Sequence, residues 1–220
     1  YHGHRARLKA RFAEHGADAL PDYELLEMVL FNASPRADVK PLAKRLIAAF
    51  GDFNHVVSAP RTRLMAVEGV GEAAVHQLKL VEAAAQRLAK ARVMRREVVS
   101  SWSALVSYCK TRMAHQDIET FRLLFLDRKN VLIADEEQMR GTIDAVSVHP
   151  REVVRRALDL GASAVIMVHN HPSGDPAPSQ ADITMTRKVR DALAAVDIRL
   201  HDHLIVGKDS DASLGQLGLL

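Results

Sequence analysis

Two histidines separated by one residue, His169 and His171, end an apolar run that is typical of a buried β-strand. Side chains at positions i and i+2 of a strand point to the same face, so the two imidazoles are expected to meet. Asp182 lies one turn into the next expected helix. Two imidazoles and a carboxylate leave the fourth position of a tetrahedral zinc ion open for water, as in catalytic zinc sites. The sequence therefore predicts one Zn²⁺ per chain.

Each of these residues also has an ordinary structural explanation. A single histidine at a strand end is usually a hydrogen-bonded surface residue. Asp182 follows Ser179 by three positions, which also fits a capping box in which the carboxylate accepts from the Ser179 N–H. The spacing of the whole set favours the metal site over three separate explanations.

Other residues that could bind a metal or react are weaker candidates for a functional site. His201 and His203 repeat the same spacing on a later expected strand, but no third ligand follows at a sensible distance. We expect His203 to be a hydrogen-bonded core residue near the first histidine pair. Cys109 lies on a helical stretch with no evident activating neighbour, and we interpret it as a packing residue.

The elements that position the histidines alternate between helices and strands. Apolar periodicity and turn residues predict helices at 100–113, 149–161 and 178–196 and strands at 121–127, 130–138, 162–170 and 197–207. This order indicates an α/β sandwich.

The chain before this region is expected to be entirely helical. The spacing of apolar residues and the glycine and proline stops predict helices at 5–16, 23–33, 39–51, 53–59 and 61–67 and a long alanine-rich helix that ends near residue 92. Asp22 is expected to cap the second of them. Gly69, Val70 and Gly71 form the turn before the long helix, where glycines let an external group approach the backbone. The free N–H groups of a helix N-terminus suit a phosphate there, although an ordinary interhelical turn fits equally well.

The charge differs between the two regions. Residues 1–97 carry 16 basic and 11 acidic side chains, a net charge of +5, and residues 98–220 carry 14 and 16, a net charge of −2. This asymmetry suggests two domains, 1–97 and 98–220, with different partners. A basic helical domain is a candidate for binding nucleic acid, or it is simply a solvated arginine-rich surface.

Composition excludes several classes of protein. A single cysteine excludes a disulfide framework and a cysteine-based zinc knuckle, and it fits a reducing, cytoplasmic compartment. Three tyrosines, six phenylalanines and one tryptophan are too few for a broad platform that stacks bases. No stretch approaches the roughly 18 apolar residues of a membrane helix. The sequence does not indicate an oligomeric state.

The segment HNHPSGDPAPSQAD carries a resemblance to a known family. His169, His171, Ser179 and Asp182 have the spacing of the JAMM (MPN+) metalloprotease signature. With VHPREVVRRAL upstream and DHLIVG downstream, the chain closely resembles bacterial RadC proteins over essentially its whole length. The fold implied is an all-α helix-hairpin-helix bundle followed by a JAMM/MPN-like, cytidine-deaminase-like α/β/α sandwich. A few dozen residues of a typical RadC N-terminus are expected to be absent.

The resemblance also implies roles for the site residues. His169, His171 and Asp182 would bind zinc, and Ser179 would hold the oxyanion or orient the scissile carbonyl. A glutamate on an earlier strand would be the general base. Asp135, Glu136 and Glu137 are the candidates, and the family pattern, which places its acidic residue five positions before a glycine, favours Glu136. A solvated edge-strand charge is the alternative. Asn170 stands where eukaryotic relatives usually have Ser or Thr, which points to a different substrate.

Three functions are compatible with these features. The first is a zinc metallopeptidase that hydrolyses a peptide or isopeptide bond in an unknown protein or peptide. The second is a DNA-associated repair or recombination module that binds nucleic acid without sequence preference through Gly69, Val70 and Gly71. The third is a metal-dependent nuclease, although two metal ions usually serve that reaction.

Overall fold

The computed structural model describes residues 2–141 and 148–220, and the chain divides into two compact units. The first ends at Ala85 and the second begins at Gln86, so the division falls inside helix α6 (Glu72–Val93) rather than after residue 97. Val75 and Leu78 of this helix belong to the core of the first unit, whereas Val93 belongs to a core of the second. One continuous helix serves two cores, and this explains why the boundary lies inside it.

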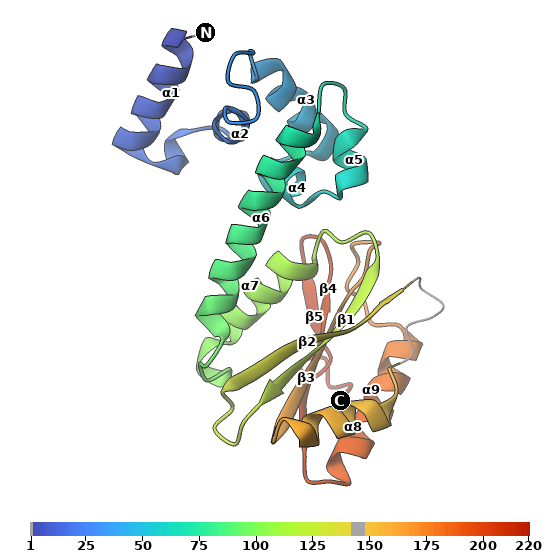
Figure 1. Cartoon of the computed structure of the whole chain (residues 1–220). Helices are drawn as coiled ribbons and strands as arrows, with labels where there is room; N and C mark the ends of the chain where they lie inside the picture. The colour runs from blue at the N-terminus through green and yellow to red at the C-terminus, as the bar shows by residue number, and fades with distance from the viewer. Residues whose placement is uncertain (1, 142–147) are drawn as a thin grey trace. The chain divides into compact units, whose positions relative to one another are not determined.

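The first unit is helical, as the periodicity predicts. Before α6 its α-helices are α1 (His2–His15), α2 (Asp22–Leu30), α3 (Lys40–Phe50), α4 (Phe53–Ser58) and α5 (Arg61–Met65), with a 3-10 turn η1 (Ala17–Ala19) (Figure 1). Fully buried leucines from these helices form the core, namely Leu26, Leu30, Leu46, Leu64 and Leu78.

Local signals explain most of the helix ends in this unit. Gly51 ends α3 with φ = 102°, a backbone conformation that glycine adopts without strain. Asp52 then caps α4 by accepting from the His55 backbone N–H. The expected cap at Asp22 is wrong, because α2 begins at Asp22 itself, after Pro21. The Asp22 carboxylate instead accepts from the backbone N–H of Phe53 and so ties α2 to the start of α4.

The second unit is built on a five-stranded mixed sheet in the order β2-β1-β3-β4-β5. Its strands are β1 (Glu119–Leu126), β2 (Leu132–Gly141), β3 (Ala164–Asn170), β4 (Arg199–Val206) and β5 (Asp211–Ser213). Its helices are η2 (Val99–Ser101), α7 (Trp102–Met113), α8 (Pro150–Asp159) and α9 (Gln180–Ala194). Strands β3 and β4 are parallel, and the other neighbouring pairs are antiparallel.

Helices cover both faces of this sheet, which makes the unit an α/β/α sandwich. Residues of α7 pack with Leu124 and Ile166 on one face, and residues of α8 and α9 pack with Leu123 and Val165 on the other (Figure 1). The expected fold class, helical first and α+β afterwards, is confirmed. Strand β5 was not expected, because three residues are too few to show a period.

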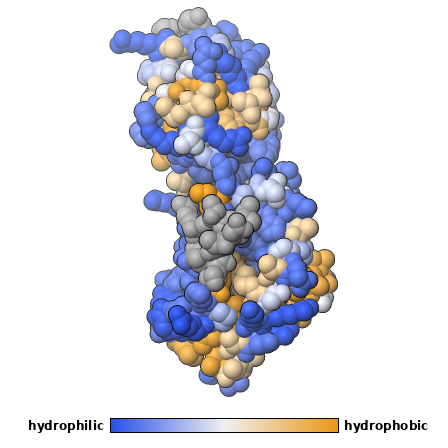
Figure 2. All heavy atoms as spheres, turned by 90° about the vertical axis from the view of Figure 1, so that its right-hand side faces the viewer, coloured by the Kyte–Doolittle hydropathy of each residue, from blue (hydrophilic) through white to orange (hydrophobic). Residues whose placement is uncertain are grey.

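The surface carries apolar residues among polar ones. The face shown in Figure 2 is mainly hydrophilic, with smaller hydrophobic areas between. Large exposed apolar side chains come from several elements, including Leu80, Leu88, Leu158 and Leu217. Among the described helices, none has the length and apolar character that crossing a membrane requires.

Candidate metal centre

The structure brings His169, His171 and Asp182 together where β3 ends and α9 begins. The Nε2 atoms of the two histidines are 2.9 Å apart. Asp182 Oδ1 lies 3.4 Å from His169 Nε2, and Asp182 Oδ2 lies 3.5 Å from His171 Nε2. One ligand atom from each residue falls within 4.8 Å of the others. The convergence follows from the two-residue period of a strand and from the position of Asp182 in the first turn of α9.

A chain of buried hydrogen bonds fixes the tautomer of His169. Its Nδ1 lies 2.8 Å from Nε2 of His203, and Nδ1 of His203 lies 2.6 Å from the Thr186 hydroxyl. That hydroxyl donates its only hydrogen to the Asp182 carbonyl, so it accepts from His203. His203 Nε2 must then accept from His169 Nδ1–H. This leaves the lone pair on His169 Nε2 free to bind a metal.

His171 is oriented in a different way with the same result. Its Nδ1 donates to the Asp175 carbonyl over 2.8 Å, so Nε2 carries the lone pair whenever the ring is neutral. Asp175 belongs to the loop after β3, which Gly174 turns with φ = 95°. The Gly174 carbonyl accepts from the Lys208 backbone N–H. The loop is therefore part of the support of the second ligand.

Asp182 takes part in a capping box and also faces the two histidines. The Ser179 backbone N–H and hydroxyl both donate to Asp182 Oδ2, and the Asp182 N–H donates to Ser179 Oγ. This is the capping box that the sequence offered as an alternative to metal binding. The box leaves Oδ1 directed toward His169, so capping and ligation are compatible.

Burial and mutual charge control the protonation of the site. Burial lowers the pKa of His169 to about 4. The charge of His171 also lowers this pKa, and the charge of Asp182 partly offsets both effects. The bond to Asp182 raises the pKa of the more exposed His171, against the effect of burial. Burial alone would raise the pKa of Asp182, but the two histidines and Ser179 together lower it. The cluster thus presents an ionised carboxylate and one neutral imidazole at neutral pH.

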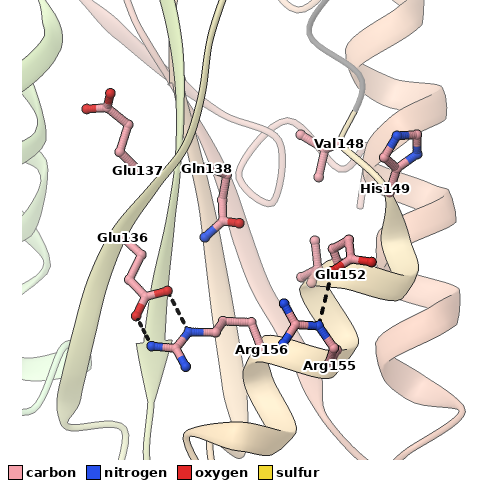
Figure 3. Close-up of a pocket in the computed structure, with 9 residues that line it drawn as sticks. Glu136, Glu137, Gln138, Val148, His149, Glu152, Arg155 and Arg156 are labelled. Atoms are coloured by element: carbon pink, nitrogen blue, oxygen red, sulfur yellow. Dashed lines mark hydrogen bonds and ion pairs between the residues drawn. The ribbon is translucent and has the colours of Figure 1, made fainter.

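Glu136 does not join this cluster. Both of its carboxylate oxygens bind the Arg156 guanidinium, one over 2.8 Å from Nε, in a pocket of about 500 Å³ between β2 and α8 (Figure 3). The β-sheet register pairs Glu136 with Leu123, which in turn faces Met167, so Glu136 stands two strands away from β3. Two strand spacings amount to roughly 10 Å. Hydrogen bonding to Arg156 lowers the pKa of Glu136, which makes it a weaker base. The expectation of a general base at Glu136 does not fit this placement.

Glu119 is the carboxylate that the register brings to the site, and it was not expected from the sequence. The antiparallel register that pairs Phe121 with His169 brings Glu119 to the level of His171. Burial raises the pKa of half-buried Glu119, while its charge interacts with His171 and Asp182. In the sequence, Glu119 is only a residue close to the start of an expected strand. It becomes a candidate site residue once this strand is known to pair with β3.

The second histidine pair is separated by an irregularity in β4. The register between β3 and β4 shifts at His201, so His201 and His203 do not act as a simple i, i+2 pair. His201 Nε2 lies 2.6 Å from Asn130 Oδ1, whereas His203 is fully buried against His169. His203 therefore supports His169 and is not itself one of the three residues that could hold a metal.

The expected nucleic-acid segment forms the turn between α5 and α6. Gly69 has φ = 86°, and Val70 is 7% exposed and packs into the helical core. A methyl group at Gly69 would lie 2.8 Å from the Arg45 guanidinium, but one at Gly71 would meet nothing within 4 Å. The fold requires glycine at the first position and leaves open space at the second.

Comparisons with known proteins agree with the two-unit architecture. A family model described as RadC-like JAB domain matches residues 99–219, and one described as UPF0758 N-terminal matches residues 3–76. A UPF0758 protein from Rhodobacter capsulatus is 63% identical over 213 residues, 97% of this chain and 100% of the relative. UPF0758 protein SPO0054 from Ruegeria pomeroyi is 61% identical over 217 residues, 99% of this chain and 97% of the relative.

Proposed function

Because the chain belongs to the RadC-like JAB domain family, we propose that it is a zinc-dependent metallopeptidase that hydrolyses a peptide or isopeptide bond. The observation that carries this proposal is the convergence of two oriented imidazoles and one carboxylate at the end of β3. Both imidazoles direct a free Nε2 lone pair inward, and Asp182 directs Oδ1 inward. This donor set fits zinc, which takes nitrogen and oxygen ligands and keeps one position open in catalytic sites.

A zinc ion held by His169, His171 and Asp182 would supply Lewis-acid polarisation of a carbonyl and lower the pKa of a nearby water. Glu119 would accept a proton from the attacking water and return it to the leaving amine. Burial raises the pKa of Glu119 toward the working pH, which suits a group that both takes and gives a proton. The described residues contain one group that could hold a metal ion, whereas metal-dependent nucleases commonly use two ions. This favours a peptidase over a nuclease.

Ser179 would hold the substrate carbonyl from the other side of the site. Its hydroxyl now donates to Asp182 Oδ2, while the side chain remains exposed to solvent. Rotation of the hydroxyl toward a bound carbonyl would retain the backbone donor from Ser179 to Asp182. This role adds one hydrogen bond to the developing oxyanion.

The test compares two glutamate variants with the wild type after loading with zinc. Glu119→Gln should retain about one zinc per chain and lose hydrolysis of a random mixture of quenched fluorescent peptides by about 100-fold or more. Glu136→Gln is the matched control and should retain most of the hydrolysis, since Glu136 binds Arg156 away from the site. Zinc should be lost in His171→Ala.

One result would reject the proposal, and another would reject the assignment of the base to Glu119. Wild-type protein that binds no zinc when metal is supplied would remove the metal centre. Full hydrolysis by Glu119→Gln, with loss in Glu136→Gln, would return the base to Glu136 and contradict the argument from β-sheet register.

Binding of DNA by the first unit is a second candidate function, and the geometry of Gly71 favours it. Gly71 has open space around it and no positive φ, so nothing within the described chain requires the absence of a side chain there. Its carbonyl accepts from Val75 at the start of α6, where free N–H groups suit a phosphate. Exposed Arg45 lies against the neighbouring Gly69.

Replacing Gly71 by aspartate tests this candidate. Aspartate is a good helix N-cap and should leave the stability of the unit intact, but its charge would repel a phosphate. We expect weaker binding of a random-sequence DNA duplex, measured by fluorescence anisotropy at several salt concentrations. Wild-type affinity that does not change with salt would contradict phosphate binding.

A further inference from the structure

Asn170, which lies between the two histidine ligands, points to the opposite face of β3 and is fully buried. A buried amide must satisfy two acceptor sites and two donors, or it destabilises the fold. The question is which part of the chain this side chain holds.

All four hydrogen-bonding positions of Asn170 are directed at one short segment. Its Oδ1 accepts from the Thr120 backbone N–H over 2.8 Å and from the Thr120 hydroxyl over 2.7 Å. Its Nδ2 donates to the Ile118 carbonyl over 3.2 Å and to the Gln116 carbonyl over 3.4 Å. A backbone N–H can only donate and a carbonyl can only accept, so the orientation of the amide is determined.

Glu119 lies between Ile118 and Thr120, two of the three residues that Asn170 binds. We propose that Asn170 is a positioning residue that holds Glu119 at the metal centre by fastening the backbone on both sides of it. The strand that supplies both imidazoles on one face thereby fixes, from its other face, the carboxylate that must act beside them. The role of Asn170 in the reaction rests on the proposed peptidase function, whereas its hold on this segment does not.

The amide is suited to this task in a way that a serine or threonine is not. A hydroxyl has one hydrogen and cannot donate to two carbonyls while it accepts from two donors on Thr120. The carbonyls of Ile118 and Gln116 precede β1, and the Thr120 N–H lies within it. Asn170 thus spans the junction where the segment before β1 enters the sheet.

The test uses Asn170→Asp and Asn170→Ala. The aspartate keeps an oxygen that accepts from Thr120 but cannot donate to the carbonyls of Ile118 and Gln116. It remains available for the test if the alanine variant fails to fold. We expect amide hydrogen exchange over residues 116–120 to rise roughly tenfold or more. Exchange in β4 and zinc content should stay at the wild-type level. Unchanged exchange over residues 116–120 would overturn the proposal.

Hydrolysis of the peptide mixture then separates positioning from general damage. Asn170→Asp should lower kcat by about 100-fold in the wild-type background, because a displaced base loses its alignment. The same change should have little further effect in Glu119→Gln, where no base remains to be positioned. Equal losses in both backgrounds would overturn the role through Glu119. If the zinc-loaded wild type cleaves no peptide, the proposed function fails, and hydrogen exchange alone decides whether Asn170 holds the segment.

Discussion

At the scale of single residues, the candidate metal centre depends on which group accepts the Nδ1–H hydrogen bond of each imidazole. The Nδ1–H of His169 donates a hydrogen bond to His203 inside the protein, and the Nδ1–H of His171 donates to the Asp175 carbonyl at the surface. The two histidines therefore present the same nitrogen, Nε2, to the cluster but differ in environment. The buried one resists protonation, and the other accepts a proton more readily because of Asp182.

This difference predicts how the stability of the metal-free protein depends on pH. The pKa of His169 is about 4 when folded, against 6.5 for an unperturbed histidine, so the unfolded chain binds more protons between these values. The free energy of unfolding should fall as pH decreases from about 6.5 to 4, by about 3 kcal/mol for this residue. The lowered pKa of His203 acts in the same direction.

Urea unfolding in the presence of a chelator at pH 7, 6 and 5 measures this effect. His171 opposes it, because its raised pKa gives stability that is present below 6.5 and lost as pH rises through the folded value. Folding lowers the pKa of Asp182 from its ordinary value of 3.8, so this residue contributes a loss of stability only below this window. His203→Gln should flatten the slope. Stability that is constant or rises toward pH 5 would contradict neutral buried histidines.

At the scale of elements, the site depends on two loops that pack against each other after β3 and β4. The His171 N–H donates to Val206 at the end of β4, and the Lys208 N–H donates to Gly174 in the loop after β3. Gly207 lies where these loops meet, and a methyl group there would stand 2.3 Å from the Gly174 carbonyl oxygen. The position of the loop that orients His171 therefore depends on a glycine in the loop after β4.

Gly207→Ala should weaken zinc binding, although residue 207 is not a ligand. The methyl group would push Gly174 away and move Asp175, whose carbonyl orients His171. Loss of such support typically lowers metal affinity by about 10-fold or more, and overpacking costs about 1–3 kcal/mol of stability. Zinc affinity by chelator competition measures the effect. Gly71→Ala is the control, and equal affinities in the two variants would contradict the steric argument.

At the scale of the whole molecule, the chain combines a helical unit with an α/β/α unit that carries the candidate metal centre. Each unit has a hydrophobic core of its own, and α6 contributes residues to cores in both. A ligand that binds one unit should therefore stabilise mainly that unit.

Zinc should raise the stability of the second unit more than that of the first. The single tryptophan, Trp102, begins α7 and reports unfolding of the second unit by fluorescence. Zinc at 100 times its Kd should stabilise this unit by about 2.7 kcal/mol and move its urea midpoint upward. Unfolding of the first unit is monitored by the helical circular dichroism signal that remains after the tryptophan fluorescence has changed. An unchanged tryptophan transition with zinc, or the same shift in His171→Ala, would contradict the assigned site.

The sequence by itself determined the helical and α/β regions and the grouping of His169, His171 and Asp182. These features are local, because strand period, helix period and the capping box act over a few residues. Only the tertiary structure shows that Glu119, and not Glu136, lies near His171 and Asp182. Strand register and the capture of Glu136 by Arg156 join residues far apart in the chain, and no local pattern encodes them. The shift at His201 likewise exists only against the neighbouring strand.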